Sequence, residues 1–149
     1  MFELDKRLEN DTITIGDFQL SRVLLSKDSR YPWCILVPRV NAITESYQLN
    51  EQQQIQLCQE SAWVASQLMV MFQGDSMNVA ALGNVVSQLH VHHVVRFEND
   101  TCWPGPIWGV GQSTPYTQSD LKSVALKITG LLEGKLGFMP VFIGDDACD

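Results

Sequence analysis

The most informative run in this sequence is Gln88-Leu89-His90-Val91-His92-His93-Val94-Val95-Arg96. It contains all 3 histidines of the chain, and its valine-rich composition is typical of a β-strand. Side chains alternate along a strand, so one face carries Gln88, His90, His92 and Arg96 and the other carries Leu89, Val91, His93 and Val95. The second face is apolar apart from His93, which is expected in the core or in a dimer contact. The first face is expected to hold a functional site, with Arg96 at the surface or in an ion pair.

Two imidazoles on one strand face, those of His90 and His92, are compatible with three kinds of chemistry. A metal site is the first, but the third protein ligand that such a site needs is not marked nearby. A structural role is the second, with both rings bonded to backbone groups. Nucleophilic catalysis is the third, in which one neutral imidazole attacks phosphorus and forms a phosphoramidate intermediate. In that role the second ring nitrogen must donate a hydrogen bond to a carbonyl or carboxylate, which fixes the tautomer.

Further strands are predicted around this one. Residues 13–15 and 22–25 are expected to form a hairpin, and 33–37 form an apolar run that Pro38 closes. Residues 77–82 are expected to be a fourth strand, joined to the histidine run, 88–95, through Gly83 and Asn84.

Two helices are predicted from capping residues and helical periodicity. Asn50 followed by Gln53 resembles a capping box, and an amphipathic helix is expected over 51–73. Its proposed apolar stripe consists of Ile55, Cys58, Ala62, Ala65, Met69 and Phe72. Thr117 and Asp120 are expected to cap a last helix, on which Leu121, Val124, Ile128 and Leu131 form the apolar stripe. Strands on both sides of one long helix, mostly joined by short turns, predict an α+β fold with an antiparallel sheet.

The composition is that of one globular domain. The chain has 149 residues, 45% of them apolar, which is enough to bury a core without metal or disulfide staples. Its 17 Asp and Glu residues against 10 Lys and Arg residues give a net charge of −7, which disfavours binding to duplex nucleic acid.

The sequence is not expected to contain a signal peptide or a membrane span. Residues 1–10 are mostly polar and charged and are not expected to be a signal peptide. The longest largely apolar stretch, 62–72, is shorter than the ~20 residues that a membrane span needs, so no membrane association is expected. The 4 cysteines form no C-x-x-C pair, which disfavours a zinc ribbon and predicts reduced thiols in a cytoplasmic protein.

Residues 88–95 resemble the histidine triad motif, His-φ-His-φ-His-φ-φ, with Gln88 in place of the first histidine. Residues 30–39 are similar to the strand of that family that ends in Pro-Lys/Arg, and the long helix and then 82–84 follow in the family's order. The resemblance covers roughly 2–100. It implies an antiparallel five-stranded sheet with one long helix, here with an additional C-terminal helix. The expected organisation is a histidine-triad-like domain over 1–100, with a Trp/Pro/Gly loop and helix in 101–149 packed on the same domain.

The resemblance also implies an activity, namely hydrolysis or nucleotidyl transfer at the α-phosphate of a nucleoside phosphate, phosphoramidate or dinucleoside polyphosphate. Carried onto this chain, it makes His90 the nucleophile and His92 a ligand of phosphate oxygens. Gln88 then offers its amide to the substrate. Asn84 is expected at the ribose or phosphate, or else is a turn residue after Gly83. Asp28 is a candidate for binding the ribose hydroxyls.

The resemblance further implies a nucleotide as the partner, a homodimer, and no tightly bound cofactor or metal, with Mg²⁺ only as a companion of a polyphosphate substrate. Two departures from the family's pattern concern proton transfer. Asn41 stands where a histidine often follows the Pro-Lys/Arg strand, and Val85-Val86 show no hydroxyl residue, since Ser87 is displaced from that position. A noncatalytic nucleotide-binding module with a degenerate triad is therefore the alternative, and a metal-dependent enzyme is a third.

The segment 102–109 contains two tryptophans among prolines and glycines, which exclude a regular helix. It is expected to be a rigid loop that packs Trp103 and Trp108 onto the body or onto a second protomer. The alternative is a wall on which a nucleobase stacks at the mouth of the site. The acidic end, 144–149, is expected to fray.

Overall fold

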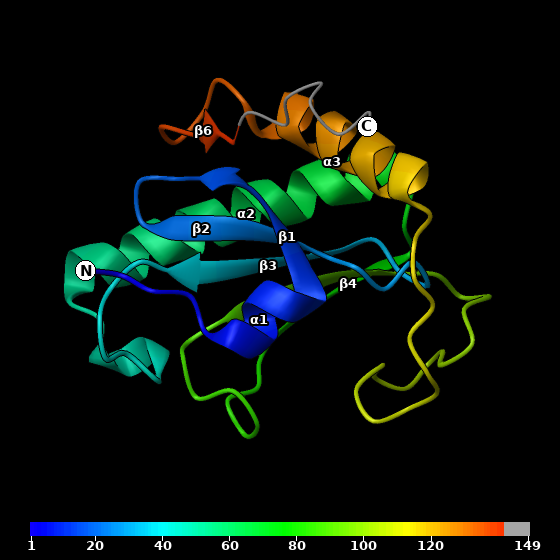
Figure 1. Cartoon of the computed structure of the whole chain (residues 1–149), viewed down its shortest axis with the longest axis horizontal. Helices are drawn as coiled ribbons and strands as arrows, with labels where there is room; N and C mark the ends of the chain where they lie inside the picture. The colour runs from blue at the N-terminus through cyan, green and yellow to red at the C-terminus, as the bar shows by residue number, and fades with distance from the viewer. Residues whose placement is uncertain (142–149) are drawn as a thin grey trace.

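The protein folds around one antiparallel sheet, as predicted for an α+β chain. The computed structural model describes residues 1–141, so the acidic end lies outside the described residues. Within them, the sheet has 6 strands in the order β4-β5-β3-β2-β1-β6 (Figure 1). The strands are β1 (Thr12–Asp17), β2 (Ser21–Ser26), β3 (Trp33–Pro38), β4 (Ser76–Ala81), β5 (Val91–Arg96) and β6 (Met139–Pro140). The sixth strand was not predicted, because a pair of residues that bonds to the edge of β1 carries no periodic signal.

The helices are α1 (Lys6–Asp11), the 3-10 turn η1 (Ser46–Gln48), α2 (Glu51–Phe72) and α3 (Gln118–Leu132). The capping box that predicted α2 is confirmed, since Asn50 Oδ1 accepts from the Gln53 amide at 2.9 Å and Gln53 Oε1 accepts from the Asn50 amide at 3.0 Å. Thr117 caps α3 as expected by accepting from the Asp120 amide. The short helix α1 was missed, because a single turn and a half is too brief to show helical periodicity.

The predicted apolar stripe of α2 is wrong in its first half, where Cys58 and Ala62 are exposed, whereas Met69 and Phe72 of the same stripe do pack against the core. Ile55 is 54% exposed, and the buried face consists of Leu57, Glu60, Val64 and Leu68. The buried glutamate explains why the pattern misled, because its carboxylate replaces an apolar side chain. Glu60 accepts the backbone amides of Leu20 and Ser21 at 3.0 and 2.9 Å, which fastens α2 to the β1–β2 turn.

The two faces of the sheet have different roles. One face carries the main core and is covered by α2 and α3. On the other face, Leu24, Ile35 and Val37 pack against Leu8 of α1 and against Val86. This second layer is thinner, and it leaves room for a cavity between the sheet and its loops.

The histidine run supplies both faces, although β5 begins at Val91 and not at Gln88 as predicted. Ile35 of β3 pairs with His92, and Cys34 pairs with His93, so the two adjacent histidines lie on opposite sides of the sheet. Arg96 is buried at the far end of β5 and forms an ion pair with Asp100, with 2.8 Å between Nε and Oδ2. The ion-pair alternative for Arg96 is therefore confirmed.

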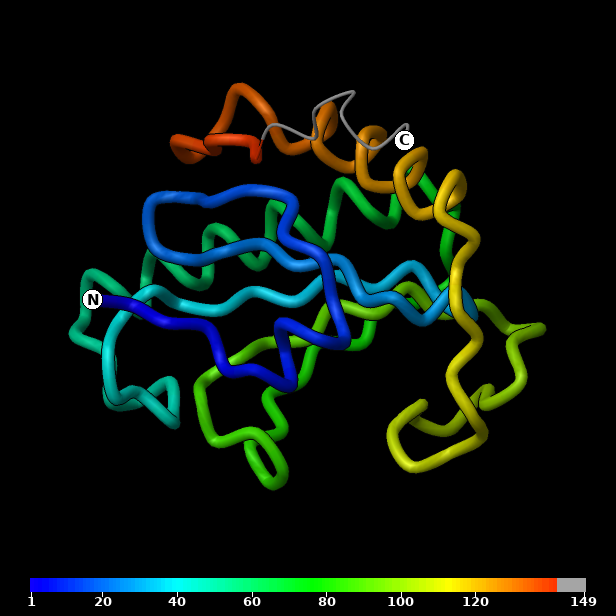
Figure 2. The backbone as a smooth tube through the Cα atoms, viewed as in Figure 1, coloured from blue at the N-terminus to red at the C-terminus, as the bar shows by residue number. Residues whose placement is uncertain are grey.

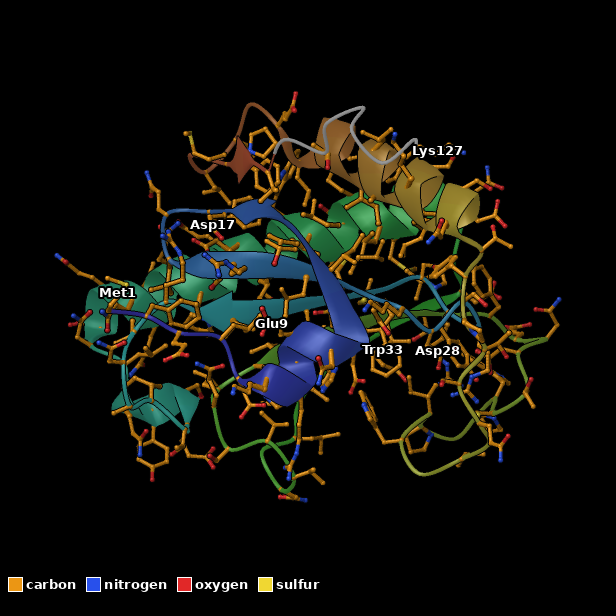
Figure 3. All side chains as sticks on the ribbon, viewed as in Figure 1. Met1, Glu9, Asp17, Asp28, Trp33 and Lys127 are labelled. Atoms are coloured by element: carbon orange, nitrogen blue, oxygen red, sulfur yellow. The ribbon has the colours of Figure 1, made fainter. Side chains whose placement is uncertain are left out.

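The long segment between β5 and α3 returns along the turn between β2 and β3 (Figure 2). Asp28 forms an isolated bridge with Pro115, and the Ser29 amide donates to the Thr114 carbonyl at 2.7 Å. Asp28 and Trp33 lie near one another where this segment crosses (Figure 3). The returning segment therefore forms one side of the hollow surface described next.

Candidate functional site

A cavity of about 610 Å³ lies on the thinly covered face of the sheet. Its walls come from α1, the ends of β2 and β3, the loop that precedes β5 and the loop that follows it. The lining side chains include His90 and His92 together with Arg7, Leu8, Asp11, Thr12, Ser26, Trp33, Ile35, Asn84, Val86 and Trp108. The two histidines that the sequence placed on one face therefore do share a cavity.

His90 is oriented by the main chain of the same loop. Its Nδ1 lies 2.7 Å from the carbonyl oxygen of Gln88. A carbonyl oxygen only accepts hydrogen bonds, so the proton of the neutral ring sits on Nδ1. Nε2 then keeps its lone pair, and no hydrogen bond from the described residues engages it. This is the arrangement that a nucleophilic imidazole requires.

His92 carries the opposite tautomer. The indole Nε1–H of Trp33 donates to His92 Nδ1 at 3.0 Å, which leaves the ring proton on Nε2. The rings of His90 and His92 are nearly perpendicular, at 77°, with centroids 5.0 Å apart. Burial, with repulsion from the neighbouring His90 and His93 as smaller causes, lowers the pKa of His92 to about 3. His92 is thus neutral at physiological pH and acts as a hydrogen-bond donor.

His93 takes no part in the cavity and belongs to the core, which is one of the two roles that the sequence predicted. Its Nδ1 donates to the Val91 carbonyl, and its Nε2 accepts from the Ser61 hydroxyl of α2 at 2.6 Å. Burial lowers the pKa of His93 to about 4, although the hydrogen bond to Val91 opposes the shift. The imidazole therefore serves as a neutral bridge between the sheet and α2.

Gln88 does not point into the cavity, contrary to the prediction that it offers its amide to a substrate. Its Oε1 accepts from the Asp5 amide at 2.9 Å, and its Nε2 donates to the Glu3 carbonyl at 2.9 Å. The side chain thereby holds the N-terminal segment, and Gln88 contributes to the site through its main-chain carbonyl instead. Asn84, in contrast, lines the cavity from an exposed position.

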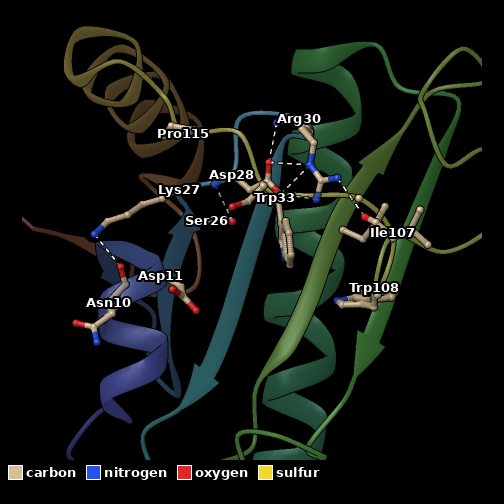
Figure 4. A pocket seen from close by; sticks show the side chains of 14 residues that line it. Asn10, Asp11, Ser26, Lys27, Asp28, Arg30, Trp33, Ile107, Trp108 and Pro115 are labelled. Carbon is tan, nitrogen blue, oxygen red and sulfur yellow. Dashed lines mark hydrogen bonds and ion pairs between the residues drawn. The ribbon is translucent and has the colours of Figure 1, made fainter.

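Asp28 lies in an adjoining hollow of about 380 Å³, whose wall shares Asp11, Ser26, Trp33 and Trp108 with the histidine cavity (Figure 4). Both carboxylate oxygens of Asp28 are already bonded, to Arg30 at 2.8 Å and to the Thr114 amide at 3.2 Å, among others.

Burial alone would raise the pKa of Asp28, but the bonds from Arg30 and Thr114 outweigh it and hold the pKa below its usual value. Arg30 also donates to the Val110 carbonyl at 3.2 Å. The hydrogen bonds of Asp28 and Arg30 therefore hold the returning loop beside the cavity.

Sequence reasoning missed several residues of this site. Trp33 and Trp108 flank the His92 ring with centroids at 5.5 and 5.3 Å, and Arg7 brings a guanidinium to the cavity wall. Trp108 was considered only as a general packing or stacking residue. Strand register and loop return bring these side chains together, and no local pattern in the sequence signals either.

The residues departing from the expected proton-transfer pattern lie elsewhere. Ser87 lines a different hollow, next to Gln88, and Asn41 is exposed outside the histidine cavity. Within residues 1–141, no group of three or more His, Cys, Asp or Glu side chains is arranged to hold a metal ion. None of the helices there is long and apolar enough to cross a membrane.

Comparison with known proteins places this geometry in context. A family model described as the HIT domain matches residues 7–99. A histidine triad protein from Marinobacter aquaeolei VT8 is 50% identical, and its crystal structure superposes with a TM-score of 0.87 over 89% of this chain and 97% of that one.

Two further crystal structures are also similar. A histidine triad protein from Sinorhizobium meliloti 1021 is 41% identical, with a TM-score of 0.86 over 89% of this chain and 98% of that one. One from Bradyrhizobium japonicum is 42% identical, with a TM-score of 0.83 over 85% of this chain and 95% of that one. No protein with a curated functional description matches this chain.

Proposed function

We propose that this chain, which belongs to the HIT domain family, is a nucleotide hydrolase or nucleotidyl transferase that acts at an α-phosphate through a covalent bond to His90. The observation that supports the proposal is the pair of opposite tautomers in one cavity. His90 offers a lone pair from Nε2, and His92 offers a proton from Nε2 beside it. A nucleophile next to a hydrogen-bond donor is what an in-line attack on phosphorus needs.

In the first step, the lone pair of His90 Nε2 forms a bond to the α-phosphorus. The bond from phosphorus to the leaving group breaks, and the leaving group departs with its electron pair. The ring becomes positively charged, and its Nδ1–H remains bonded to the Gln88 carbonyl, which disperses that charge. His92 donates to a phosphate oxygen in the crowded intermediate.

In the second step, a water oxygen attacks the same phosphorus. The P–N bond breaks, its electron pair returns to Nε2, and one proton of the water is released to solvent. The product is a nucleoside monophosphate, or another nucleotide ester if an alcohol replaces water. His90 is thereby restored.

The remaining cavity residues are proposed to hold the nucleotide. Arg7 supplies a positive charge for the phosphates, and Asn84 an amide for the phosphate or ribose. Since the oxygens of Asp28 are occupied, Asp11 and Ser26, which line both hollows, are better placed for the ribose hydroxyls. Trp108 offers an indole face to a base at the junction.

The leaving group is proposed to be one that departs without strong acid assistance, such as a polyphosphate accompanied by Mg²⁺. Neither Ser87 nor Asn41 lies in the cavity to donate a proton. General-acid assistance is typically worth ~10²–10⁴-fold. A phosphoramidate, whose amine needs that proton, is therefore expected to turn over slowly.

The position of Ser87 and Asn41 outside the cavity also supports the competing proposal of a noncatalytic nucleotide-binding module. Mass spectrometry of protein denatured at alkaline pH, where a P–N bond to histidine survives, separates the two after mixing with adenosine 5′-phosphoramidate or diadenosine tetraphosphate. A mass increase of one adenylyl group that His90→Ala abolishes supports catalysis. His93→Gln is the matched control, because that histidine lies on the opposite face and the adduct should survive its replacement. Nucleotide binding by calorimetry without adduct or turnover would establish the module instead.

We also propose that the protein forms a homodimer through β4 and the neighbouring face of α2. Among the described residues no strand pairs with the outer edge of β4. Val79 on β4 is 50% exposed, and Tyr47 beside the start of α2 is 75% exposed. An apolar hollow between α2 and β4 includes Cys58 and Ala81. An unpaired edge with apolar neighbours is suited to pairing with a second copy.

A cytoplasmic location is proposed from the thiols. Cys34, Cys58 and Cys102 are free, and burial raises the pKa of Cys34 to about 12, which makes that thiol inert. Free thiols are typical of reducing compartments.

A further inference from the structure

The contact between Trp33 and His92 restricts the chemistry of the second cavity histidine. An indole nitrogen carries a hydrogen and has no acceptor capacity, so Trp33 Nε1 only donates. Its partner, His92 Nδ1 at 3.0 Å, must therefore hold a lone pair. Protonation of Nδ1 would break this bond and set two hydrogens against each other. The contact thus disfavours both the imidazolium and the Nδ1–H tautomer.

The surroundings of His92 act in the same direction. Its ring packs against the indoles of both Trp33 and Trp108, and the side chain is 7% exposed. The titratable neighbours are His90, with its ring centroid at 5.0 Å, and His93, which is adjacent in the chain. The charged side chains on the cavity wall are Arg7 and Asp11 of α1. No described hydrogen bond joins a carboxylate or carbonyl to His92, so no anionic partner stabilises its charged form.

His90 provides the contrast within the same cavity. A carbonyl acceptor holds its proton on Nδ1, whereas an indole donor holds the proton of His92 on Nε2. If both Nδ1 atoms faced a carbonyl, both Nε2 atoms would carry lone pairs. If both Nδ1 atoms faced an N–H donor, both Nε2 atoms would carry protons. The different partners therefore create the division into one nucleophile and one donor.

We infer that Trp33 is a positioning residue, which acts through His92 by keeping that ring neutral with its proton on Nε2. The inference deepens the proposed function and rests on it for its catalytic meaning. It assigns His92 a fixed role as a donor to phosphate oxygens. It also removes His92 as a source of the proton for the leaving group, because a neutral donor that surrendered Nε2–H would become an anion.

The tautomer is measured directly by ¹⁵N nuclear magnetic resonance of protein labelled in its histidine rings. His92 is expected to show a lone-pair-bearing Nδ1 and a protonated Nε2, unchanged between pH 8 and 5. His90 is expected to show the reverse assignment, with its proton on Nδ1. A proton on Nδ1 of His92, or its conversion to imidazolium near pH 6.5, would overturn the inference.

Trp33→Phe removes the donor and keeps an aromatic ring beside His92. Burial still lowers the pKa of His92 in this variant, but Nδ1 no longer has a donor opposite it, so the ¹⁵N spectrum at pH 7 should show a mixture of the Nδ1–H and Nε2–H tautomers. Loss of one hydrogen bond predicts that kcat falls roughly two- to tenfold at pH 7. A folded Trp33→Phe protein in which His92 keeps only the Nε2–H tautomer would refute the role of the indole N–H.

Trp108→Phe is the matched control. Trp108 packs on the same imidazole at nearly the same centroid distance, 5.3 against 5.5 Å, but its Nε1 makes no hydrogen bond. Trp108→Phe should keep the Nε2–H tautomer of His92. If the tautomer of His92 changed equally in Trp33→Phe and Trp108→Phe, ring packing and not the indole N–H would determine it. Because the resonance measurement needs no substrate, it can succeed even if no His90 adduct forms, so failure of the proposed function is distinguishable from failure of this inference.

Discussion

Two buried neutral histidines should make the folded state sensitive to mild acid. The pKa of His92 is lowered to about 3 and that of His93 to about 4, mainly by burial, from an ordinary value of 6.5. Below pH 6.5 these two histidines bind protons in the unfolded chain but stay unprotonated in the folded chain. The stability that these residues contribute is therefore fully present above pH 6.5 and is lost as the pH falls toward the folded-state pKa values.

The size of this effect follows from proton linkage. Between the unfolded-state and folded-state pKa values, each full pH unit changes the free energy of unfolding by about 1.4 kcal/mol per histidine. Between pH 7 and 5 each histidine accounts for a loss of about 2 kcal/mol, because titration of the unfolded ring is only partial near pH 6.5. The window ends above both folded-state pKa values, so the result barely depends on their position. Together the two residues predict a loss of about 4 kcal/mol.

Urea unfolding followed by tryptophan fluorescence measures this loss. With a slope of roughly 2 kcal/mol per molar urea, the midpoint should fall by about 2 M from pH 7 to pH 5. His93→Gln should be less stable at pH 7, yet its pH dependence should be smaller by about 2 kcal/mol, and His92→Asn should reduce it by a similar amount. A wild-type midpoint that stays constant, or a His93→Gln protein that loses stability as steeply as the wild type, would refute the reasoning.

Three other substitutions test separate features. Glu60→Ala should lower the free energy of unfolding by about 2–4 kcal/mol, because the buried amides of Leu20 and Ser21 lose their acceptor; a loss under about 1 kcal/mol in urea titrations would contradict that account. Gln88→Ala should reduce stability while leaving KM within about twofold, since its amide bonds are to backbone groups of the N-terminal segment, and a tenfold rise in KM would restore the substrate-binding role predicted from sequence. Val79→Asp should convert a dimer into a monomer in light-scattering measurements without loss of helicity, and a variant that remains dimeric would place the interface elsewhere.

The parts of the fold that were predictable from sequence are those whose cause is local. The capping box of Asn50 and Gln53 marked the start of α2, and alternation along the histidine run separated His92 from His93. The first half of the α2 stripe was misjudged because a local pattern treats Glu60 as solvent-exposed. The backbone amides that donate to its buried carboxylate lie about 40 residues earlier in the chain, at the β1–β2 turn.

The site was predictable to the same extent. His90 and His92 carried a motif, and Asn84 followed from its place in the chain. Asp28 looked available because sequence does not reveal that Arg30 and the Thr114 amide occupy its oxygens. Trp33 was counted as a core residue of β3, since only the register with β5 brings its indole to the ring of His92.

Gln88 links the N-terminal segment to His90, the proposed nucleophile. Gln88 orients His90 with its carbonyl and grips Glu3 and Asp5 with its amide. A change in the first five residues can therefore reach His90 through Gln88 alone.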